Sequence, residues 1–369
     1  MIRTFHSIGQ GAFYTEIFNN YIVAYDCGSS NKNLIINEIN WTLNQGEIID
    51  VVFISHFDSD HINGLEHLLK HCKVKKLILP LIHDDEKIEW FVHNYVNGVR
   101  DDFIDNLINE PSIVIKKETE LYFIDRVKGK QDSFDIKPIS FEKLKGNVLE
   151  NVKLYFEQIS NWVYIPFNFQ SEVRSLCLKE ELQSRNLDIK NVRDFQEAWS
   201  DSEKRKSIKE AYKKIPGDIN SNSLTLYSGP EKIIAIQKIL NLHYHLVLRQ
   251  FSYSKLFKFF KSNAGCLYYG DYNAKGTQNW TELYNRYKNY CKYLGILQVP
   301  HHGSHKNYNP SINSKKNLLS VISAGISNQH GHPHPSTVRK ILNNDGIPLI
   351  VNENPGSRVI CDIYSLNVF

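Results

Sequence analysis

Four apolar runs in this sequence each end in histidine or aspartate residues. The first, "VVFISHFDSDH" (residues 51–61), ends in His56, Asp58, Asp60 and His61; the later runs lead to Asp271, to His301 and His302, and to His330, His332 and His334. In an α/β sheet, strand ends on one edge converge, and sites form there. Seven of the 15 histidines lie in these groups, a distribution that scattered structural histidines would not produce. We therefore predict one site at one edge of an α/β fold.

Alternating apolar and polar residues predict strands near both ends of the chain. Residues 2–9, 12–18 and 21–28 are predicted to form antiparallel strands, and residues 32–45 carry apolar side chains at helical spacing. A buried strand (50–56), a helix (61–72) and a strand (75–80) are expected next. Later strands are predicted at 152–160, 162–169, 221–229 and 266–271, from 294 and 318 onward, and at 347–354 and 358–366, with a helix capped by Ser336. The order indicates an antiparallel start followed by βαβ units.

The segment 170–215 differs in composition from the rest of the chain. It is charged, rich in helix formers and free of proline and glycine, which predicts two or three helices ending at Pro216-Gly217. Its positive and negative charges nearly balance, so we expect a solvated helical surface; the alternative is a surface that binds nucleic acid or a partner protein.

Length and composition set broad limits. With 369 residues, of which 41% are hydrophobic, the chain can bury a sizeable core in one large or two smaller domains. The net charge of +4 leaves room for a local basic groove. Six scattered cysteines without a CxxC pair are expected to be reduced core residues. No 18-residue apolar run occurs, and "MIRTFHSIGQG" lacks a signal peptide's apolar core, so we predict a cytoplasmic protein without a membrane segment.

Histidine and carboxylate side chains together suit Zn²⁺, Mn²⁺ or Fe ions. In an extended segment His56 and Asp58 point to the same side, whereas Asp60 and His61 turn off at the start of the next helix. A carboxylate such as that of Asp271 has two oxygens and can bridge two cations. This spacing predicts two divalent metal ions that share an activated water.

Several motifs resemble one family. "SHFDSDHINGL", "YYGDYN", "VPHHGSH" and "GHPHPS" look like the metallo-β-lactamase fold, specifically the branch typified by the nuclease domain of the DNA-uptake protein ComEC. "IGQGAF", "AYDCGSS" and "SNSLTLYSG" resemble the first hairpin, the Asp-x-Gly turn and a strand of that branch. The resemblance implies a single domain over 1–369 with a four-layer αββα sandwich. It leaves 82–220 as a long insertion, helical at about 170–215.

The resemblance also implies a ligand set. The first metal would be bound by His56, Asp58 and His302, and the second by Asp60, His61 and His332, with Asp271 bridging the two; His334 is the alternative to His332. Asp60 and His301 are the predicted catalytic residues, with His301 expected to stabilise the transition state or protonate the leaving group. Asp58 stands where most of the superfamily has a histidine, so Mn²⁺ becomes a rival to Zn²⁺.

Other residues receive weaker predictions. Asp26 is expected to orient a ligand histidine from its turn. Ser304, Asn307 and His334 lie near the site in sequence, and either a substrate contact or a loop-capping role fits the first two. His243 and His245 are expected to be ordinary structural or surface residues. The stretch "FSYSKLFKFFK" (251–261) fits a core helix as well as a base-stacking surface.

The leading functional hypothesis is a metal-dependent phosphodiesterase, specifically a nuclease acting on DNA or RNA. Lys275, Lys306, Lys315 and Lys316 support it. A second hypothesis is hydrolysis of a small or cell-envelope phosphoester, as in the phosphorylcholine esterases of the superfamily. A third is an effector that docks a partner protein through 170–215, and family context suggests a role in bacterial defence against phage.

Overall fold

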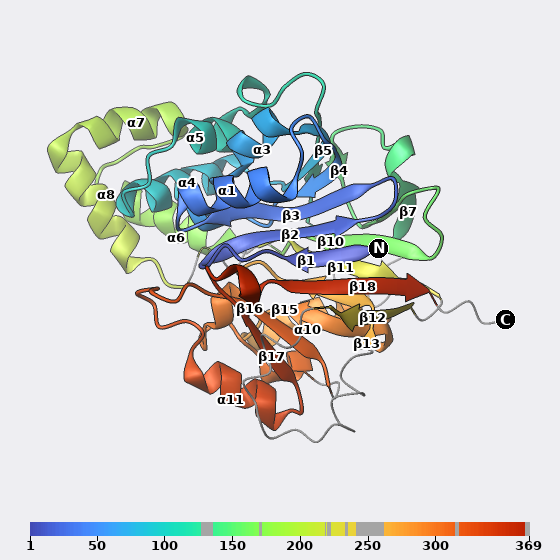
Figure 1. Ribbon diagram of the computed structural model, residues 1–369. Coiled ribbons are helices and arrows are strands. Elements are labelled where there is room, and N and C mark those ends of the chain that lie inside the picture. The colour runs from blue at the N-terminus through green and yellow to red at the C-terminus, as the bar shows by residue number, and fades with distance from the viewer. Residues whose placement is uncertain are drawn as a thin grey trace.

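The computed structural model describes residues 1–126, 136–169, 172–217, 219, 223–232, 235–240, 262–313 and 317–365. Two β-sheets pack face to face, and helices cover the outer face of each sheet (Figure 1). This is the predicted αββα sandwich of the metallo-β-lactamase fold. The histidines at 243 and 245, the aromatic stretch 251–261 and the lysines at 315 and 316 lie outside the described residues.

The first sheet contains ten strands in the order β13-β12-β18-β1-β2-β3-β4-β5-β6-β8. Their bounds are β1 Ile2–Phe5, β2 Gly11–Ile17, β3 Ile22–Ser29, β4 Ile48–Phe53, β5 Lys73–Pro80, β6 Glu120–Ile124, β8 Val148–Leu149, β12 Ala235–Ile239, β13 Ser262–Asn263 and β18 Val359–Ser365. The predicted antiparallel start is confirmed, because β1 pairs with β2 and β2 with β3 in antiparallel register. From β3 to β8 the strands are parallel.

The second sheet contains eight strands in the order β17-β16-β15-β14-β11-β10-β9-β7. Their bounds are β7 Lys137–Ser140, β9 Val152–Tyr155, β10 Trp162–Phe167, β11 Thr225–Pro230, β14 Gly265–Tyr268, β15 Leu294–Gln298, β16 Leu319–Ser323 and β17 Ile347–Val351. The strands β14 to β17 are parallel, so the loops after β14, β15 and β16 leave the sheet at the same edge. The strands β14, β15 and β16 correspond to the three later apolar runs of the sequence, and the loops after them carry the aspartate and histidine residues.

Helices form the outer layers. Over the first sheet lie α1 Lys32–Thr42, α2 Ser59–Ile62, α3 Leu65–His71, α4 Asp84–Val96 and α5 Asp102–Asn109, and over the second lie α10 Thr277–Tyr287 and α11 Pro335–Asn343 (Figure 1). Short 3₁₀ turns occur at Pro111–Ile113, Phe141–Lys143, Cys291–Tyr293, His301–Gly303, Pro310–Asn313 and Pro355–Ser357. The predicted helix at 61–72 is interrupted at Asn63 and Gly64. Within the described ranges, no helix has the length and apolar character needed to span a membrane.

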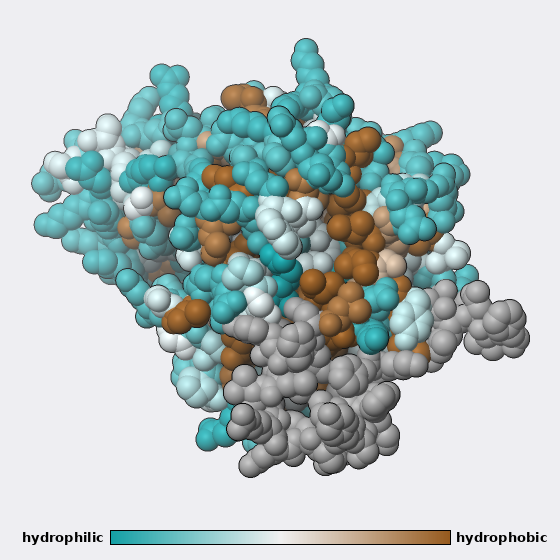
Figure 2. Space-filling view, in the orientation of Figure 1, coloured by the Kyte–Doolittle hydropathy of each residue, from teal (hydrophilic) through white to brown (hydrophobic). Residues whose placement is uncertain are grey.

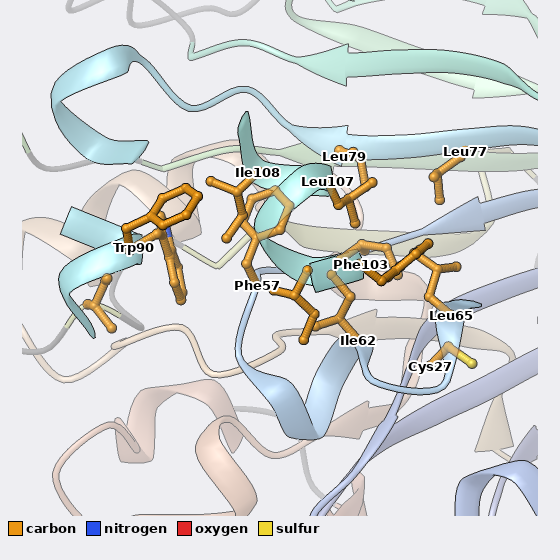
Figure 3. Packing of buried hydrophobic residues seen from close by; sticks show 14 of the residues in the cluster. Cys27, Phe57, Ile62, Leu65, Leu77, Leu79, Trp90, Phe103, Leu107 and Ile108 are labelled. Atoms are coloured by element: carbon orange, nitrogen blue, oxygen red, sulfur yellow. The ribbon is translucent and has the colours of Figure 1, made fainter. Parts of the chain in front are cut away.

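Strand alternation explains how the layers separate. In β4 the side chains of Val51 and Phe53 enter the core between the sheets, whereas Val52, between them in sequence, packs under the helices. Successive side chains of a strand point to opposite faces, and a strand buried on both faces is apolar throughout. Phe57, directly after β4, packs edge-on against Trp90 of α4 at 5.8 Å between ring centroids (Figure 3).

The segment 170–215 forms three helices, α6 Glu172–Gln183, α7 Val192–Ser200 and α8 Ser202–Lys214. They pack on α4, and the surface over α7 and α8 is mostly hydrophilic (Figures 1 and 2). Residues 120–167 behave differently, because their strands join both sheets. Only the helical part of 82–220 is therefore an addition outside the sheets, and the division into domains stays a prediction.

Candidate metal centre

Two glycines let the short helix α2 sit directly on the first sheet. A Cβ atom added at Gly28 would lie 2.4 Å from the backbone nitrogen of Ile62 and 2.6 Å from the carbonyl carbon of Asp60. A Cβ atom added at Gly11, which adopts φ +139°, would lie 2.5 Å from the backbone oxygen of Asp60. No other residue fits so close a backbone contact. Gly28, in the sequence "DCG" at 26–28, therefore sets how closely α2, which carries Asp60 and His61, packs on the sheet.

Asp26 fixes the ring of His61. Its carboxylate lies 2.8 Å from His61 Nδ1 and accepts hydrogen bonds from the backbone N–H (2.6 Å) and the hydroxyl (2.7 Å) of Ser55. Asp26 is fully buried and adopts φ +57°, a strained conformation for a residue other than glycine. A carboxylate beside Nδ1 keeps the proton on that nitrogen, so His61 Nε2 carries the lone pair. Asp26 thus lies where the predicted supporting role requires it.

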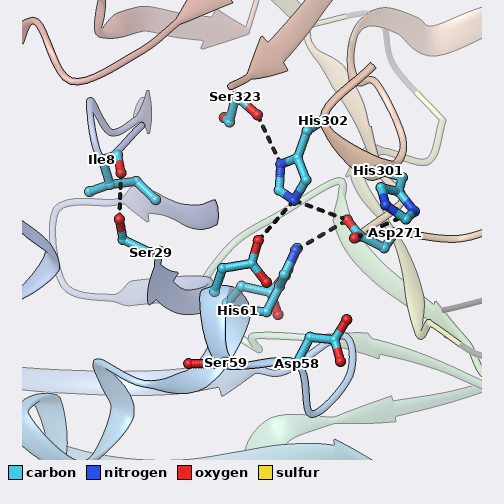
Figure 4. Close-up of polar contacts among 12 residues, drawn as sticks. Ile8, Ser29, Asp58, Ser59, His61, Asp271, His301, His302 and Ser323 are labelled. Carbon is cyan, nitrogen blue, oxygen red and sulfur yellow. Dashed lines mark hydrogen bonds and ion pairs between the residues drawn. The ribbon is translucent and has the colours of Figure 1, made fainter. Parts of the chain in front are cut away.

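His302 is oriented in the same way. Its Nδ1 lies 2.9 Å from the carbonyl oxygen of Ser323 at the end of β16, and its Nε2 lies 3.1 Å from Asp60 Oδ2 and 3.6 Å from Asp271 Oδ1 (Figure 4). Both His301 (φ +47°) and His302 (φ +51°) have left-handed backbone conformations. Strain of this kind concentrates at functional sites. His302 therefore neighbours Asp60, which differs from the predicted pairing with Asp58.

His56 and Asp58 form the other side of the centre. The Nδ1 atom of His56 lies 2.8 Å from the hydroxyl of Ser55 and 3.3 Å from that of Ser223. Its Nε2 lies 3.7 Å from Asp58 Oδ2, as expected for two residues on the same side of an extended segment. The rings of His56 and His61 are 4.1 Å apart, so both sides of the centre meet at His61.

Opposite charges shift the pKa values of these groups. Burial disfavours the charged imidazole of His61, but the carboxylates of Asp271 and Asp26 outweigh it and raise its pKa well above the usual value. The pKa of His302 is raised for the same reason, with Asp271 as the main partner. Burial would raise the pKa of the Asp271 carboxyl, yet the surrounding imidazoles hold it well below the usual range. The Asp271 carboxylate is therefore ionised at neutral pH.

Asp58 and Asp60 follow the same pattern. Burial would raise the pKa of Asp58, but His93 and His56 hold it well below the usual value. Burial opposes the charge of Asp60 too, and the hydrogen bond with His302 and the charge of His61 lower its pKa. A buried group of carboxylates is stable only beside positive charge, which cationic histidines or bound metal ions can supply.

The donor set fits divalent metal ions. Two overlapping groups, His56–His61–Asp271 and Asp60–His61–His302, each hold ligand atoms within 4.8 Å of one another. The Nε2 atoms of His56, His61 and His302 are buried and face the carboxylates of Asp58, Asp271 and Asp60, whereas the Nδ1 atom of each ring is held by a hydrogen-bond partner on the other side. Metal-ligating histidines are held in this way through their second nitrogen.

The remaining predicted residues lie around this centre. His332 is half-buried, and the centre of its ring lies 6.3 Å from that of His302. Burial is the main cause that lowers its pKa to about 4, and the charges of His302 and His301 add to the shift. His301 Nδ1 lies 3.7 Å from Asp271 Oδ2. His334 caps α11, because its Nδ1 accepts the backbone N–H of Ser336 at 3.1 Å. The predicted Ser336 cap is thus wrong by two residues.

Ser304 and Asn307 hold the loop after β15. The hydroxyl of Ser304 accepts the N–H of Lys306 at 3.2 Å. The amide of Asn307 lies 3.3 Å from the carbonyl oxygen of Asp271 and so supports the loop that carries this carboxylate. The sequence left open a substrate contact or a loop-capping role for Ser304 and Asn307, and these contacts fit the loop-capping role.

Two further residues support the centre, although no sequence pattern points to them. Asn328 binds the backbone of His332 through both its amide atoms, with its oxygen 2.8 Å from the N–H and its nitrogen 2.6 Å from the carbonyl. His93 of α4 lies 3.1 Å from Asp58 Oδ1. In the sequence it occupies one position of an amphipathic helix, and no local pattern distinguishes it from a packing residue.

The fold and the centre together define a metallo-β-lactamase sandwich with His/Asp groups able to hold divalent metal ions. Residues 23–156 match the family model described as Metallo-beta-lactamase superfamily. Similar solved structures include human tRNase Z, short form (ELAC1), at 10% identity and TM-score 0.37, covering 95% of this chain and 92% of that one. The metallo-beta-lactamase fold protein YhfI from Bacillus subtilis is 7% identical, with TM-score 0.35 and 98% coverage of both chains. No curated protein sequence matches the chain significantly. The ComEC-like branch stays a prediction.

Proposed function

We propose that this protein is a metal-dependent hydrolase that cleaves phosphodiester bonds, and that it acts as a nuclease on DNA or RNA. One observation carries the proposal. Two His/Asp groups overlap at His61, and their histidine Nε2 atoms face the centre while each Nδ1 is held from behind. Two-metal sites of this kind serve in-line displacement at phosphorus.

We assign the ligands from the contacts. Asp60, His61 and His302 would hold one ion, His56 and Asp58 the other, and Asp271 would lie between them. When bound, the ions supply an activated water and neutralise charge on the phosphate oxygens. Three carboxylates beside three imidazoles form a relatively hard set, which keeps Mn²⁺ as a rival to Zn²⁺. His332 stays a predicted additional ligand.

Asp60 and His301 are accessible enough for proton transfer. The carboxylate of Asp60 is 23% exposed and the imidazole of His301 is 20% exposed, whereas His61 and His302 are almost fully buried. We assign Asp60 to orienting the attacking water, because its carboxylate accepts hydrogen bonds. We assign His301, at the rim beside Asp271, to protonating the leaving oxygen.

The charge of the loops around the centre favours a polyanionic substrate. Between residues 272 and 344 the sequence holds nine lysines and arginines and a single acidic residue, Glu282. Part of this charge gathers around His305, three residues after His302: the pKa of His305 is lowered by desolvation and by the positive charges of His334, Lys275, Lys306 and Lys340. Phosphate contacts from such residues provide most of the nonspecific affinity for nucleic acids.

The proposal is tested with purified protein and labelled single- and double-stranded DNA and RNA, in Mn²⁺, Zn²⁺ or Mg²⁺. We expect cleavage that chelation abolishes and that Asp60→Asn reduces by at least about 100-fold. Asp188→Asn, an exposed aspartate on the helical segment, is the matched control and should retain full activity. No cleavage of any nucleic acid, or full activity of Asp60→Asn, would sink the proposal.

Chromogenic substrates distinguish the nuclease from the alternative, an enzyme that hydrolyses small phosphoesters. A phosphodiesterase cleaves bis(p-nitrophenyl) phosphate faster than p-nitrophenyl phosphate, whereas cleavage of small esters without nucleic-acid cleavage would favour the small-phosphoester hypothesis. A role as an effector in anti-phage defence, docking through 170–215 and cytoplasmic location stay predictions.

A further inference from the structure

A chain of three side chains connects the added helices with the centre. On one side of the His93 ring, Nε2 lies 3.1 Å from Asp58 Oδ1. On the other side, Nδ1 lies 2.6 Å from the hydroxyl of Tyr212 on α8. Because Nε2 faces a carboxylate, the neutral ring keeps its proton there, and Nδ1 accepts the hydrogen bond from the tyrosine O–H.

Tyr212 is itself held in place. The guanidinium carbon of Arg174, on α6, lies 5.2 Å from the centre of the tyrosine ring. Arg174 also pairs with Glu89 of α4 and donates to the carbonyl oxygens of Pro216 and Gly217 at 3.1 and 2.7 Å, just beyond the end of α8. Burial raises the pKa of Tyr212 to about 12, so the phenol keeps the proton that it donates. The helices α4, α6 and α8 therefore fix the His93 ring from behind.

The contact with His93 divides the two oxygens of Asp58. Oδ1 faces the His93 ring, and Oδ2 faces His56 Nε2 at 3.7 Å. A free carboxylate can bind a metal ion through both oxygens, whereas a carboxylate with one oxygen in an ion pair has a single oxygen left for the metal, as an imidazole has a single nitrogen. Trp90, one turn before His93 on α4, lies 6.2 Å from His56 between ring centroids and covers this side of the centre.

We propose that His93 is a positioning residue for Asp58, held in turn by Tyr212, so that the helices at 172–214 determine how one metal ion is bound. The role rests on the proposed metal centre, and it gives these helices a function beyond a solvated surface. His93 acts through Asp58 and has no contact with substrate in this role.

Calorimetric titration of the metal-stripped full chain with Mn²⁺ and with Zn²⁺ tests the role without relying on activity. We expect His93→Gln to weaken one of the two binding events by about 10–100-fold, the usual cost of losing a residue that orients a ligand, and to leave the other unchanged. Tyr212→Phe removes only one hydrogen bond and should weaken the same event by about 3–10-fold.

Double variants distinguish positioning from a general structural effect. If His93 acts through Asp58, His93→Gln should add less than about 2-fold in an Asp58→Asn background, and Tyr212→Phe should add nothing to His93→Gln. His71→Gln on α3 and Tyr95→Phe on α4 each remove one side-chain hydrogen bond that does not involve Asp58 or His93, and both should leave the two binding events unchanged. Unaltered affinity in His93→Gln, or an equal loss with and without Asp58, would overturn the role.

The same titration separates this role from the proposed function. Two bound ions without nucleic-acid cleavage would refute the nuclease while the variants still decide the role of His93. A chain that binds no divalent metal would refute both. If His93→Gln does not fold, the milder Tyr212→Phe carries the same prediction.

Discussion

Asparagine in place of Asp26 should disrupt the centre without touching a proposed ligand. The Asp26 carboxylate is fully buried and accepts three contacts, two from Ser55 and one from His61 Nδ1. An asparagine amide has one acceptor oxygen. If that oxygen keeps the backbone N–H of Ser55, the amide nitrogen faces the N–H of His61, and two donors oppose each other.

The magnitude follows from the hydrogen bonds that the substitution removes. A hydrogen bond to a charged group contributes about 1.5–3 kcal/mol, and an unsatisfied buried donor costs about 1–3 kcal/mol. The hydroxyl of Ser55 can turn to His56 Nδ1, 2.8 Å away, so the cost at this hydroxyl is small. We expect Asp26→Asn to lower the free energy of unfolding by about 3–5 kcal/mol. The proton of His61 should also move to Nε2, which lowers metal affinity by about 10–100-fold.

The assay combines denaturant unfolding of the metal-free protein with metal titration. Asp50→Asn is the matched control, because Asp50 is a buried carboxylate that accepts the N–H of Ile22 and pairs with Lys75 away from the centre. The control should lose stability and keep its metal affinity. If Asp26→Asn keeps its metal affinity as Asp50→Asn does, the orienting role of Asp26 is refuted.

Three further predictions concern pH, backbone packing and metal removal. Burial raises the pKa of Glu89 from 4.5 to about 7, and Arg174 opposes the shift. The folded state therefore binds the Glu89 proton more tightly than the unfolded state does. The bound proton stabilises the fold by about 3 kcal/mol below pH 4.5, and this stabilisation is lost as the pH rises to 7. Glu89→Gln cannot lose this proton, so the difference in unfolding free energy between the variant and the natural chain should rise from pH 5 to pH 8. A difference that is equal at pH 5 and pH 8 would contradict the raised pKa of Glu89. Gly28→Ala should displace α2 and lower activity on the order of 100-fold, while Gly276→Ala, whose Cβ would meet no atom closer than 3.7 Å, should not. A metal ion at 100 times its dissociation constant should stabilise the chain by about 2.7 kcal/mol; a melting temperature that chelation leaves unchanged would exclude such binding.

Most of the fold could be predicted because its signals are local. The alternation in residues 12–18 and 21–28 marks strands whose two faces differ, and the uniformly apolar run 51–54 marks a strand buried on both sides. The strands at 120–124 and 137–140 were not predicted individually, because strands of four or five residues contain too few positions to show a clear pattern. The break of the expected 61–72 helix also escaped prediction, although Asn63-Gly64 is a combination that often ends a helix.

The candidate site was predicted at the level of residue groups, and its pairings were not. Strand ends on one edge must converge, so His56, Asp60, Asp271 and His302 could be expected together from their positions alone. Which imidazole lies beside which carboxylate depends on loop conformations such as the left-handed backbone of His301 and His302. Histidine is among the residue types enriched in that conformation, but only a small share of histidines adopt it, so the sequence does not identify these two positions.

His93 shows where prediction from sequence ends. Its contacts with Asp58 and Tyr212 join residues 35 and 119 positions away, and neither pairing follows a periodicity. Trp90 and His93 are one turn apart on α4, so the helix face that buries Trp90 against Phe57 also turns His93 toward Asp58. A helix that looks like ordinary core packing in the sequence can therefore position a metal ligand, because the same apolar contact that docks the helix sets the direction of its polar neighbour.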